Sequence, residues 1–379
     1  MITEKQAYCN GNLISYNKYC VILRQVVINI NKSSSFSKGG ENISEVISQK
    51  EQDELIETKP GFFQMHCDTK PNKTFFNKVG HLKNWADSLE ITSKVRSATI
   101  TEDLLTIAIV RYDYANLYWV MVDVYNIFFI TSILEINPEN IHILIVDTHP
   151  ISIVDKIWTL LFPKVTSIGH YGSNDTIMFK TLLWGLHRGE SPLLKNGNFR
   201  SFPFLEEFRN FVLLKTSYRR ITHPINCYNL TITIVLRRDY VAHPRNPSGK
   251  VGRKIANEIE LLNKVSIAFR NHSVRGIQLD HYTVDEQIRL TSQTDILVGM
   301  HGAGLSHVLF IPKHASLIEL FPSTYSTISH FEFIARWRRI NYFKWKNLDR
   351  KMEVDKYTTK VDVKVVTDLL LQAQKRMCS

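Results

Sequence analysis

The chain has 379 residues, 44% of them hydrophobic, so it can bury a large core, and its length suggests two domains. Its formal net charge of +11 implies attraction to anions. Because lysine and arginine are spread along the chain without a run of five or more, a nucleic-acid-binding protein is disfavoured. Binding of a phosphorylated small molecule would account for a smaller, localised part of this positive charge.

Residues 1–59 are polar, and a Ser/Lys/Gly/Glu-rich stretch covers residues 32–59. This composition predicts a loosely structured arm or stem instead of a domain. No signal peptide is evident, because the early apolar run at residues 20–30 is short and interrupted by Arg24 and Gln25. Either a membrane anchor lies outside this sequence, or the protein is not secretory.

The five cysteines have no CxxC spacing, which disfavours a zinc site. They fit either free thiols or one or two disulfides with a leftover cysteine. Six N-X-S/T sequons favour a protein of the secretory pathway and predict glycosylation. The sequons begin at Asn31, Asn42, Asn72, Asn174, Asn229 and Asn271.

Strands alternate with helices from residue 105 onward. Apolar runs predict buried strands at 105–110 and 141–146 and a long helix at 117–134, a pattern typical of βα units with a mostly parallel sheet. Asp113 follows the first strand, where α/β folds place ligand-binding groups. Asp123 lies inside the apolar helix, either for a functional reason or as a carboxylate satisfied within the helix.

A second α/β unit begins with a predicted strand at residues 230–236, which runs directly into Arg237. A guanidinium group binds phosphate oxygens in bidentate fashion, so an arginine at a strand's carboxyl end is suited to a diphosphate. The alternative is that Arg237 is a solvated surface residue without a ligand. Arg253 follows a Pro/Gly loop and is a second candidate for the same role.

A glycine-rich turn joins two predicted strands at residues 296–298 and 316–321. Free N–H groups and the positive end of a following helix favour a phosphate there, although a tight turn can need small residues for packing alone. Glu319 is a carboxylate within an apolar strand, which is costly unless it meets a partner such as ribose hydroxyls. The turn consists of His301, Gly302, Ala303 and Gly304.

The two α/β units predict an α/β fold of the GT-B type, with two Rossmann-like domains facing a cleft. After the arm at 1–59, we expect an acceptor-side domain at 60–224 and a nucleotide-sugar-binding domain with a C-terminal helix at 225–379. No nucleophile elbow, HExxH, P-loop or GxGxxG motif is present. A DxD motif is only weakly represented, so we expect no metal and no cofactor.

Three segments resemble glycosyltransferase family 61 and, within it, the core β-1,2-xylosyltransferases of N-glycans. The segment VGMHGAGLSHVLF is similar to the family's GAHGAGLTH. The segment RRDYVAHPRNPSGK is similar to REDYLAHPRHGGK, and RYDYANLYWVMVDVYN is similar to FEYANLFHTVTDWYS. The similarity extends in patches from residue 60 onward and keeps the order of the motifs.

The resemblance implies a GT-B fold, an inverting reaction and a UDP-sugar donor bound by the second domain. It also implies an N-glycan or glycoprotein acceptor and a luminal protein of the Golgi or endoplasmic reticulum, which contacts the membrane only through an anchor not visible here. Other members transfer N-acetylglucosamine to proteins, so an O-linked N-acetylglucosaminyltransferase is an alternative.

Trp119 stands where the family pattern has histidine, so either the catalytic base lies elsewhere or the protein is an impaired, UDP- or glycan-binding pseudoenzyme. Asp113 is our first candidate for the base and Asp123 the second. We expect the diphosphate to be bound by the two arginines and the turn, with His301 donating to the leaving group, and the ribose by Glu319. Other candidate site residues are Asn116, His243 and His307.

Overall fold

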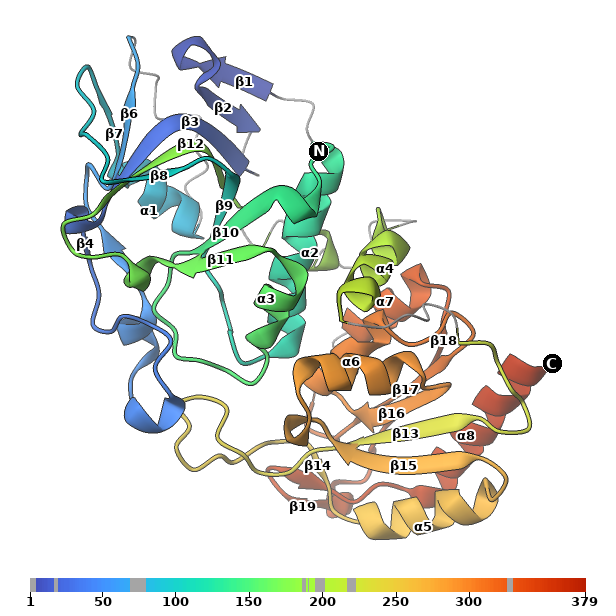
Figure 1. Ribbon diagram of the computed structural model, residues 1–379. Coiled ribbons are helices and arrows are strands. Elements are labelled where there is room, and N and C mark those ends of the chain that lie inside the picture. The colour runs from blue at the N-terminus through green and yellow to red at the C-terminus, as the bar shows by residue number, and fades with distance from the viewer. Residues whose placement is uncertain are drawn as a thin grey trace. The chain divides into compact units, whose positions relative to one another are not determined.

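The computed structural model describes residues 5–16, 20–68, 80–185, 189, 191–194, 202–216, 223–325 and 330–379. It divides the chain into two compact units (Figure 1). The first unit comprises Met1–Tyr114 and Val122–Leu194, and the second comprises Ala115–Met121 and Lys195–Ser379. The predicted α/β class is confirmed, since both units combine helices with sheets.

The first unit is built on a ten-stranded mixed sheet whose main path runs β1-β2-β3-β12-β9-β10-β11. Strands β12, β9, β10 and β11 are parallel, whereas β1 to β3 pair antiparallel. The strands are β1 (Lys5–Tyr8), β2 (Leu13–Tyr16), β3 (Cys20–Asn29), β6 (Phe63–His66), β7 (Leu89–Thr92), β8 (Ile100–Glu102), β9 (Leu105–Ile109), β10 (Ile141–Ile145), β11 (Lys164–Ser167) and β12 (Thr176–Trp184). The helices are α1 (Gly80–Ser88), α3 (Lys156–Leu161) and the part of α2 (Leu117–Ile133) from Val122 onward.

The interpretation of residues 1–59 as a loose arm is wrong for the N-terminal strands. Strand β3 lies inside the sheet, between β2 and β12, and most of its residues are buried. Its polar pair Arg24 and Gln25 is exposed, and Gln25 leaves the extended conformation with a φ of 54°. The polar pair therefore faces solvent while the apolar residues on either side of it stay in the core. The two-residue strands β4 (Ser33–Ser34) and β5 (Glu57–Thr58) pair farther along this segment.

The second unit contains a five-stranded, fully parallel sheet in the order β15-β13-β16-β17-β18. The strands are β13 (Thr231–Leu236), β15 (Ser273–Gln278), β16 (Ile296–Met300), β17 (Ser316–Phe321) and β18 (Asn341–Lys346). The helices are α4 (Leu205–Lys215), α5 (Glu258–Ala268), α6 (Val284–Ser292), α7 (His330–Trp337) and α8 (Val363–Cys378). A small sheet is formed by β14 (Lys254–Ile255), β19 (Glu353–Asp355) and β20 (Thr358–Thr359).

Alternation along β13 explains how this sheet is covered. Ile232, Ile234 and Leu236 face the core that α5 and α8 complete, whereas Thr233 lies on the opposite face and bonds to Thr294. Continuous apolar runs are typical of strands buried on both faces, and the predicted bounds of β13, β16 and β17 agree with the structure to within two residues. The predicted domain boundary at residue 224 differs from the division into units, which assigns α4 to the second unit.

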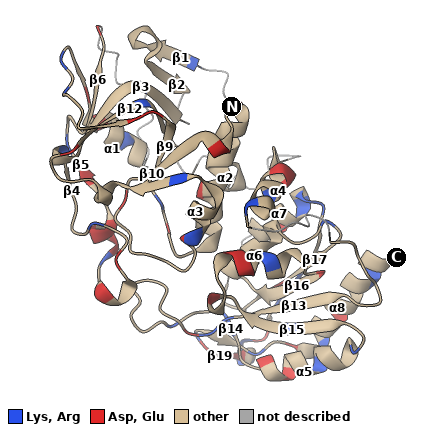
Figure 2. Cartoon of the chain, viewed as in Figure 1, with Lys and Arg blue, Asp and Glu red and all other residues tan. Residues whose placement is uncertain are grey.

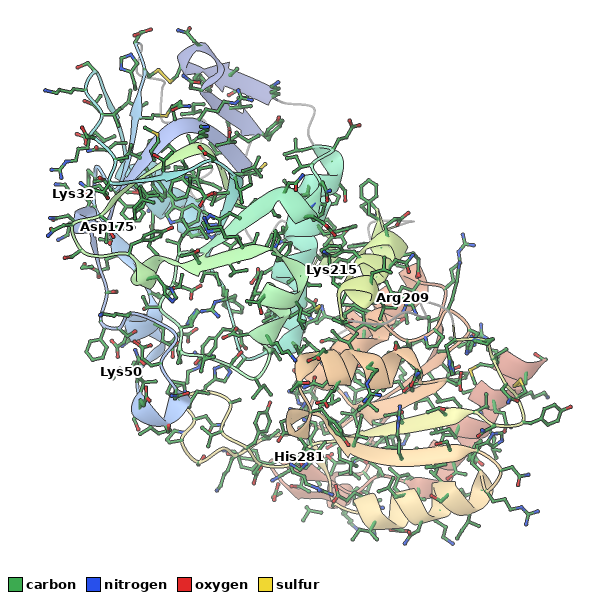
Figure 3. The ribbon with its side chains drawn as sticks, viewed as in Figure 1. Lys32, Lys50, Asp175, Arg209, Lys215 and His281 are labelled. Carbon is green, nitrogen blue, oxygen red and sulfur yellow. A yellow bond between two sulfur atoms is a disulfide. The ribbon has the colours of Figure 1, made fainter. Side chains whose placement is uncertain are left out.

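Two disulfides are present, Cys9–Cys67 and Cys227–Cys378, and their yellow bonds can be followed in Figure 3. Cys20 is a buried free thiol whose pKa burial raises to about 12. The structure thus selects the alternative of two disulfides with one leftover cysteine. No helix among the described residues combines the length and the hydrophobicity needed to span a bilayer. Figure 2 shows basic and acidic residues interspersed along both units.

Candidate functional site

Two predicted site residues lie at one edge of the second unit's sheet. Parallel strands present their carboxyl ends at the same edge, which is where α/β folds bind ligands. Arg237 follows β13 and His301 follows the neighbouring strand β16. The Arg237 guanidinium lies so close to Gly302 that a Cβ atom on Gly302 would collide with it. Glycine therefore lets the arginine side chain rest against the backbone of the turn.

Arg237 and Arg253 form a pair of cations without a carboxylate partner among the described residues. The Nε of Arg237 donates to the carbonyl oxygen of Gly252 at 2.9 Å, and the Arg253 guanidinium lies 4.9 Å from the ring centroid of Tyr325. Burial, and then the positive charge of Arg253, lower the pKa of Arg237 to about 10. Two neighbouring like charges with no acid to neutralise them favour binding of an anion.

The loop that leads from β13 to β14 folds back on itself. Asp239 accepts a hydrogen bond from the N–H of Val251 at 2.9 Å, and the N–H of Tyr240 donates to the carbonyl oxygen of Gly249 at 3.0 Å. This closure returns Arg253 to the end of β13, where it adopts a left-handed backbone conformation with a φ of 60°. In contrast to Arg237, the next residue, Arg238, has an acidic partner: it is ion-paired with Glu258 at 2.7 Å.

The turn after β16 differs from its prediction in two respects. The segment Ala303–Leu309 is a seven-residue 3₁₀ helix, so the positive end of an α-helix is missing there. The N–H of His301 donates to Leu320 of β17 at 2.8 Å, so it is not available to a phosphate. Within the described chain, the N–H groups of Gly302, Ala303 and Gly304 have no hydrogen-bond acceptor and remain candidates.

Glu319 has a different partner from the ribose that the sequence predicts. Its side chain is 0% exposed, and its two oxygens accept hydrogen bonds from His301 Nδ1 at 2.5 Å and from the Tyr342 hydroxyl at 2.7 Å. Burial, and then the carboxylate of Glu319, raise the pKa of Tyr342, which keeps its proton and donates. With Nδ1 bound to Glu319, His301 has Nε2 as its remaining polar atom. Phe321 stacks against the His301 ring at 5.2 Å and fixes its plane.

The remaining predicted candidates mainly support local structure. Burial lowers the pKa of His307 to about 4, and its Nδ1 donates to the carbonyl oxygen of Gly304 at 2.9 Å. Asn116 accepts a hydrogen bond from the N–H of Tyr118 at the start of α2. His243 lies half-buried in the loop after β13, where its carbonyl oxygen closes a turn. None of these contacts requires a ligand.

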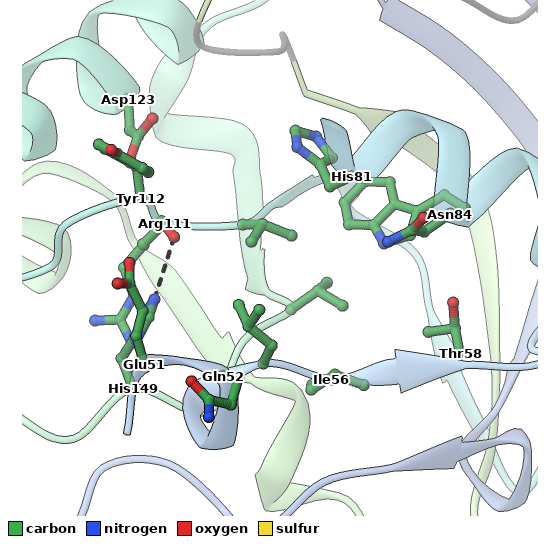
Figure 4. A pocket seen from close by; sticks show the side chains of 14 residues that line it. Glu51, Gln52, Ile56, Thr58, His81, Asn84, Arg111, Tyr112, Asp123 and His149 are labelled. Carbon is green, nitrogen blue, oxygen red and sulfur yellow. Dashed lines mark hydrogen bonds between the residues drawn. The ribbon is translucent and has the colours of Figure 1, made fainter. Parts of the chain in front are cut away.

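The first unit has its own cavity, of about 500 Å³. It lies outside the carboxyl ends of β9 and β10 and is closed by α1, α2 and residues 51–58. Asp123 lines it, facing His81 and Asn84 from the other side (Figure 4). Asp113, our first candidate for the base, is not among the residues that line it. The cavity therefore favours Asp123 over Asp113.

Arg111 and His149 also border this cavity, and neither was among the site residues predicted from the sequence. Arg111 is ion-paired with Asp147 at 2.7 Å and with Asp155 at 2.9 Å. His149 donates from Nδ1 to Glu54 at 2.7 Å and from Nε2 to the carbonyl oxygen of Arg111 at 3.2 Å, which requires an imidazolium (Figure 4). The signal in the sequence was the Asp-Thr-His segment directly after the strand at 141–146.

The stability of the first unit is expected to fall as the pH rises through the pKa of His149. Burial opposes the charge, but Asp147 and Glu54 outweigh it and raise this pKa above its usual value of about 6.5. The stabilisation is thus complete below about pH 6.5 and is lost as the pH passes the folded-state pKa. Thermal unfolding of the wild type and of His149→Phe across this range measures the effect. A wild-type curve with no steeper decline than that of the variant would contradict the assignment.

A family model described as Glycosyltransferase 61 matches residues 123–318, which is more than half of the chain. The chain belongs to the glycosyltransferase 61 family. The matched region includes Asp123, Arg237, Arg253 and the turn after β16, whereas Asp113 lies outside it. Among the described residues, no group of three or more His, Cys, Asp or Glu side chains could hold a metal ion.

Relatives within glycosyltransferase 61 include a β-1,2-xylosyltransferase of Oryza sativa, 23% identical over 346 residues that cover 81% of this chain and 64% of the relative. The β-1,2-xylosyltransferase of Arabidopsis thaliana is 23% identical over 81% of this chain and 70% of its own length. An EGF domain-specific O-linked N-acetylglucosamine transferase of Canis lupus familiaris is 24% identical over 79% and 58%. The chain thus spans between 58% and 70% of the length of these relatives.

Proposed function

We propose that the chain is an inverting glycosyltransferase of the GT-B type that takes a UDP-sugar donor. The reaction we favour transfers xylose in β-1,2 linkage to the core mannose of N-glycans, as the names of two relatives suggest. The observation that carries the donor class is the unneutralised pair Arg237 and Arg253 beside the His301 turn. The second unit is the donor side and the first unit the acceptor side.

On the donor side, Arg237 and Arg253 bind the diphosphate, together with the N–H groups of the turn. Glu319 holds His301 through Nδ1, which leaves Nε2 for the leaving diphosphate. With His301 as the imidazolium, its Nε2–H would stabilise the charge that develops there. Glu319 is a positioning residue in this scheme and does not bind ribose. No metal takes part in the proposal, because the cations come from the chain itself.

On the acceptor side, Asp123 removes the proton from the acceptor hydroxyl. The hydroxyl oxygen attacks the anomeric carbon, the bond from that carbon to UDP breaks, and the configuration inverts in one displacement. Asp123 keeps the proton until product release. Asp113, the first candidate from the sequence, is kept as the alternative base. Trp119 lies on the same face of α2 as Asp123, four residues away.

Two disulfides and exposed sequons support a luminal site in the Golgi or endoplasmic reticulum, where disulfides persist and N-glycans are added. The asparagines of five sequons are exposed, and the sixth, Asn72, lies outside the described residues. We propose that the exposed asparagines carry glycans; they are Asn31, Asn42, Asn174, Asn229 and Asn271.

Turnover by the full chain tests the proposal, with UDP-xylose and UDP-N-acetylglucosamine offered separately in EDTA. The acceptors are a trimannosyl-chitobiose glycan and a folded EGF-type domain. We expect xylose transfer to the glycan. Transfer of N-acetylglucosamine to the EGF-type domain would support the alternative that the dog relative suggests. UDP binding without any transfer would favour the pseudoenzyme, and activity lost in EDTA would contradict the metal-free reaction.

Replacing Gly302 by alanine is expected to weaken UDP binding about tenfold, the loss of one charge-assisted hydrogen bond. The new methyl group displaces the Arg237 guanidinium, and the φ of 158° at Gly302 strains any side chain there, so thermal stability is also expected to fall. Isothermal titration with UDP measures the effect. Gly252→Ala is the matched control, because its Cβ meets only Tyr357 at 3.8 Å and the carbonyl that accepts from Arg237 is kept. Equal affinities in both variants would contradict the placement of Arg237.

A further inference from the structure

The cavity of the first unit lies where the strand connections of its sheet change direction. Helix α2 connects β9 to β10 on one side, and the chain later returns on the other side, where β12 pairs with β9. In open α/β sheets, ligands bind outside the carboxyl ends of the strands at such a switch point. A small hollow of about 10 Å³ lies here between Gly185, which follows β12, and one face of α2.

Asn126 of α2 lines this hollow and is 3% exposed. Neither its Nδ2 nor its Oδ1 has a hydrogen-bond partner among the described residues. A buried amide without partners costs about 1–3 kcal/mol, so it needs an explanation. Asp123, one turn earlier on α2, lines both the hollow and the 500 Å³ cavity. The two side chains therefore place an unpaired amide beside the proposed base.

The cations at this cavity are already neutralised. Arg111 is held by Asp147 and Asp155, and His149 is held by Glu54. This distinguishes the cavity from the donor side, where the two arginines have no acidic partner among the described residues. Neither Arg111 nor His149 therefore offers its positive charge to a phosphate, which favours an uncharged ligand.

The rest of the lining suits a polyhydroxylated ring. Thr58 and Asn84 offer neutral hydrogen-bonding groups, and Trp85 and Tyr112 offer aromatic surface for the C–H faces of a sugar. Figure 4 shows Thr58 and Asn84 on the side of the cavity opposite Tyr112 and Asp123. A volume of about 500 Å³ is within the range of small-molecule sites.

We propose that this cavity binds the accepting sugar residue of the acceptor as a neutral pyranose. One hydroxyl is directed to the carboxylate of Asp123, and the Asn126 amide binds a single oxygen in the hollow, next to that hydroxyl. Asn126 is thus a positioning residue that sets which hydroxyl meets the base. This inference rests on the proposed function and adds to it the cavity where the accepting sugar binds and the residue that positions it.

The test is binding of free trimannosyl-chitobiose to the full chain in saturating UDP, by saturation-transfer NMR and calorimetry. Asn126→Leu has a similar volume and no polar atoms, so we expect glycan affinity to fall about 2- to 10-fold, the loss of a neutral hydrogen bond. Its thermal stability should not fall, since no internal bond is lost, and UDP affinity should stay unchanged. Ser132→Ala on the same helix is the control, because that hydroxyl bonds only to Phe128.

The outcomes separate this inference from the proposed function. Equal glycan affinity in wild type and Asn126→Leu would overturn the cavity assignment alone. No glycan binding by a wild type that binds UDP would overturn the cavity assignment together with the N-glycan as acceptor. A loss of stability in Asn126→Leu would assign the amide to internal structure and also overturn it. Absence of UDP binding by the wild type would instead overturn the proposed function. Competition by inorganic phosphate against the glycan would contradict a neutral ligand.

Discussion

Replacing Asp123 by asparagine is expected to lower kcat by about 10²- to 10⁴-fold, the usual contribution of a positioned general base. Asparagine keeps the shape of the side chain but cannot take the acceptor's proton. Because Asp123 lies in the first unit, UDP affinity should be unchanged. Initial rates at saturating donor and acceptor, with a separate UDP titration, measure both effects.

Asp113→Asn is the matched comparison for this prediction. Asp113 follows β9 but does not line the cavity, so we expect a change of less than about tenfold. A large loss in Asp113→Asn with little effect in Asp123→Asn would transfer the base to Asp113. Near-normal rates in both variants would place the base on another residue. Trp119→His, which restores the residue of the family pattern, should then be tested for a gain in rate.

Replacing Arg237 by alanine is expected to weaken UDP binding about 10- to 100-fold, since charge-assisted hydrogen bonds contribute about 1.5–3 kcal/mol. The protein should remain folded, because the change removes a cation whose pKa is lowered by burial and by Arg253. Isothermal titration with UDP and thermal unfolding measure the two effects.

Arg238→Ala is the control for this change, because it removes the neighbouring arginine and that side chain is ion-paired with Glu258 at 2.7 Å. UDP affinity in this variant should equal that of the wild type. An unchanged dissociation constant in Arg237→Ala would remove Arg237 from the donor site. An equal loss in both variants would indicate a general effect of positive charge instead of a specific contact.

The parallel strands and the long helices could be predicted from the sequence, because their buried residues form continuous apolar runs with clear ends. Strand β17 has the predicted bounds, and α2 ends one residue earlier than predicted. The N-terminal strands were not predicted. Strand β3 is stabilised by pairing with β12, about 150 residues away in sequence, and its polar residues Arg24 and Gln25 resemble the end of an apolar run.

The site residues likewise could be predicted where neighbouring sequence determines their position, and not where a distant segment does. Arg237 and His301 could be assigned to one sheet edge because each directly follows a strand. The partner of Glu319 could not be predicted, because Tyr342 belongs to the adjacent strand β18. The composition of a single segment does not show which strands pair. Asn126 was overlooked because it lies within an otherwise apolar helix, where a single amide carries no periodic signal.

The left-handed backbone of Arg253 and its like-charged neighbour have a consequence for the life of the protein in the cell. A non-glycine residue in this conformation costs about 1 kcal/mol, and the repulsion between the two guanidinium groups adds to it. A bound diphosphate would offset the repulsion between the guanidinium groups, and because it binds the folded chain it would reduce the fraction that unfolds and is degraded. Depletion of nucleotide sugar would then lower the abundance of the enzyme as well as its turnover.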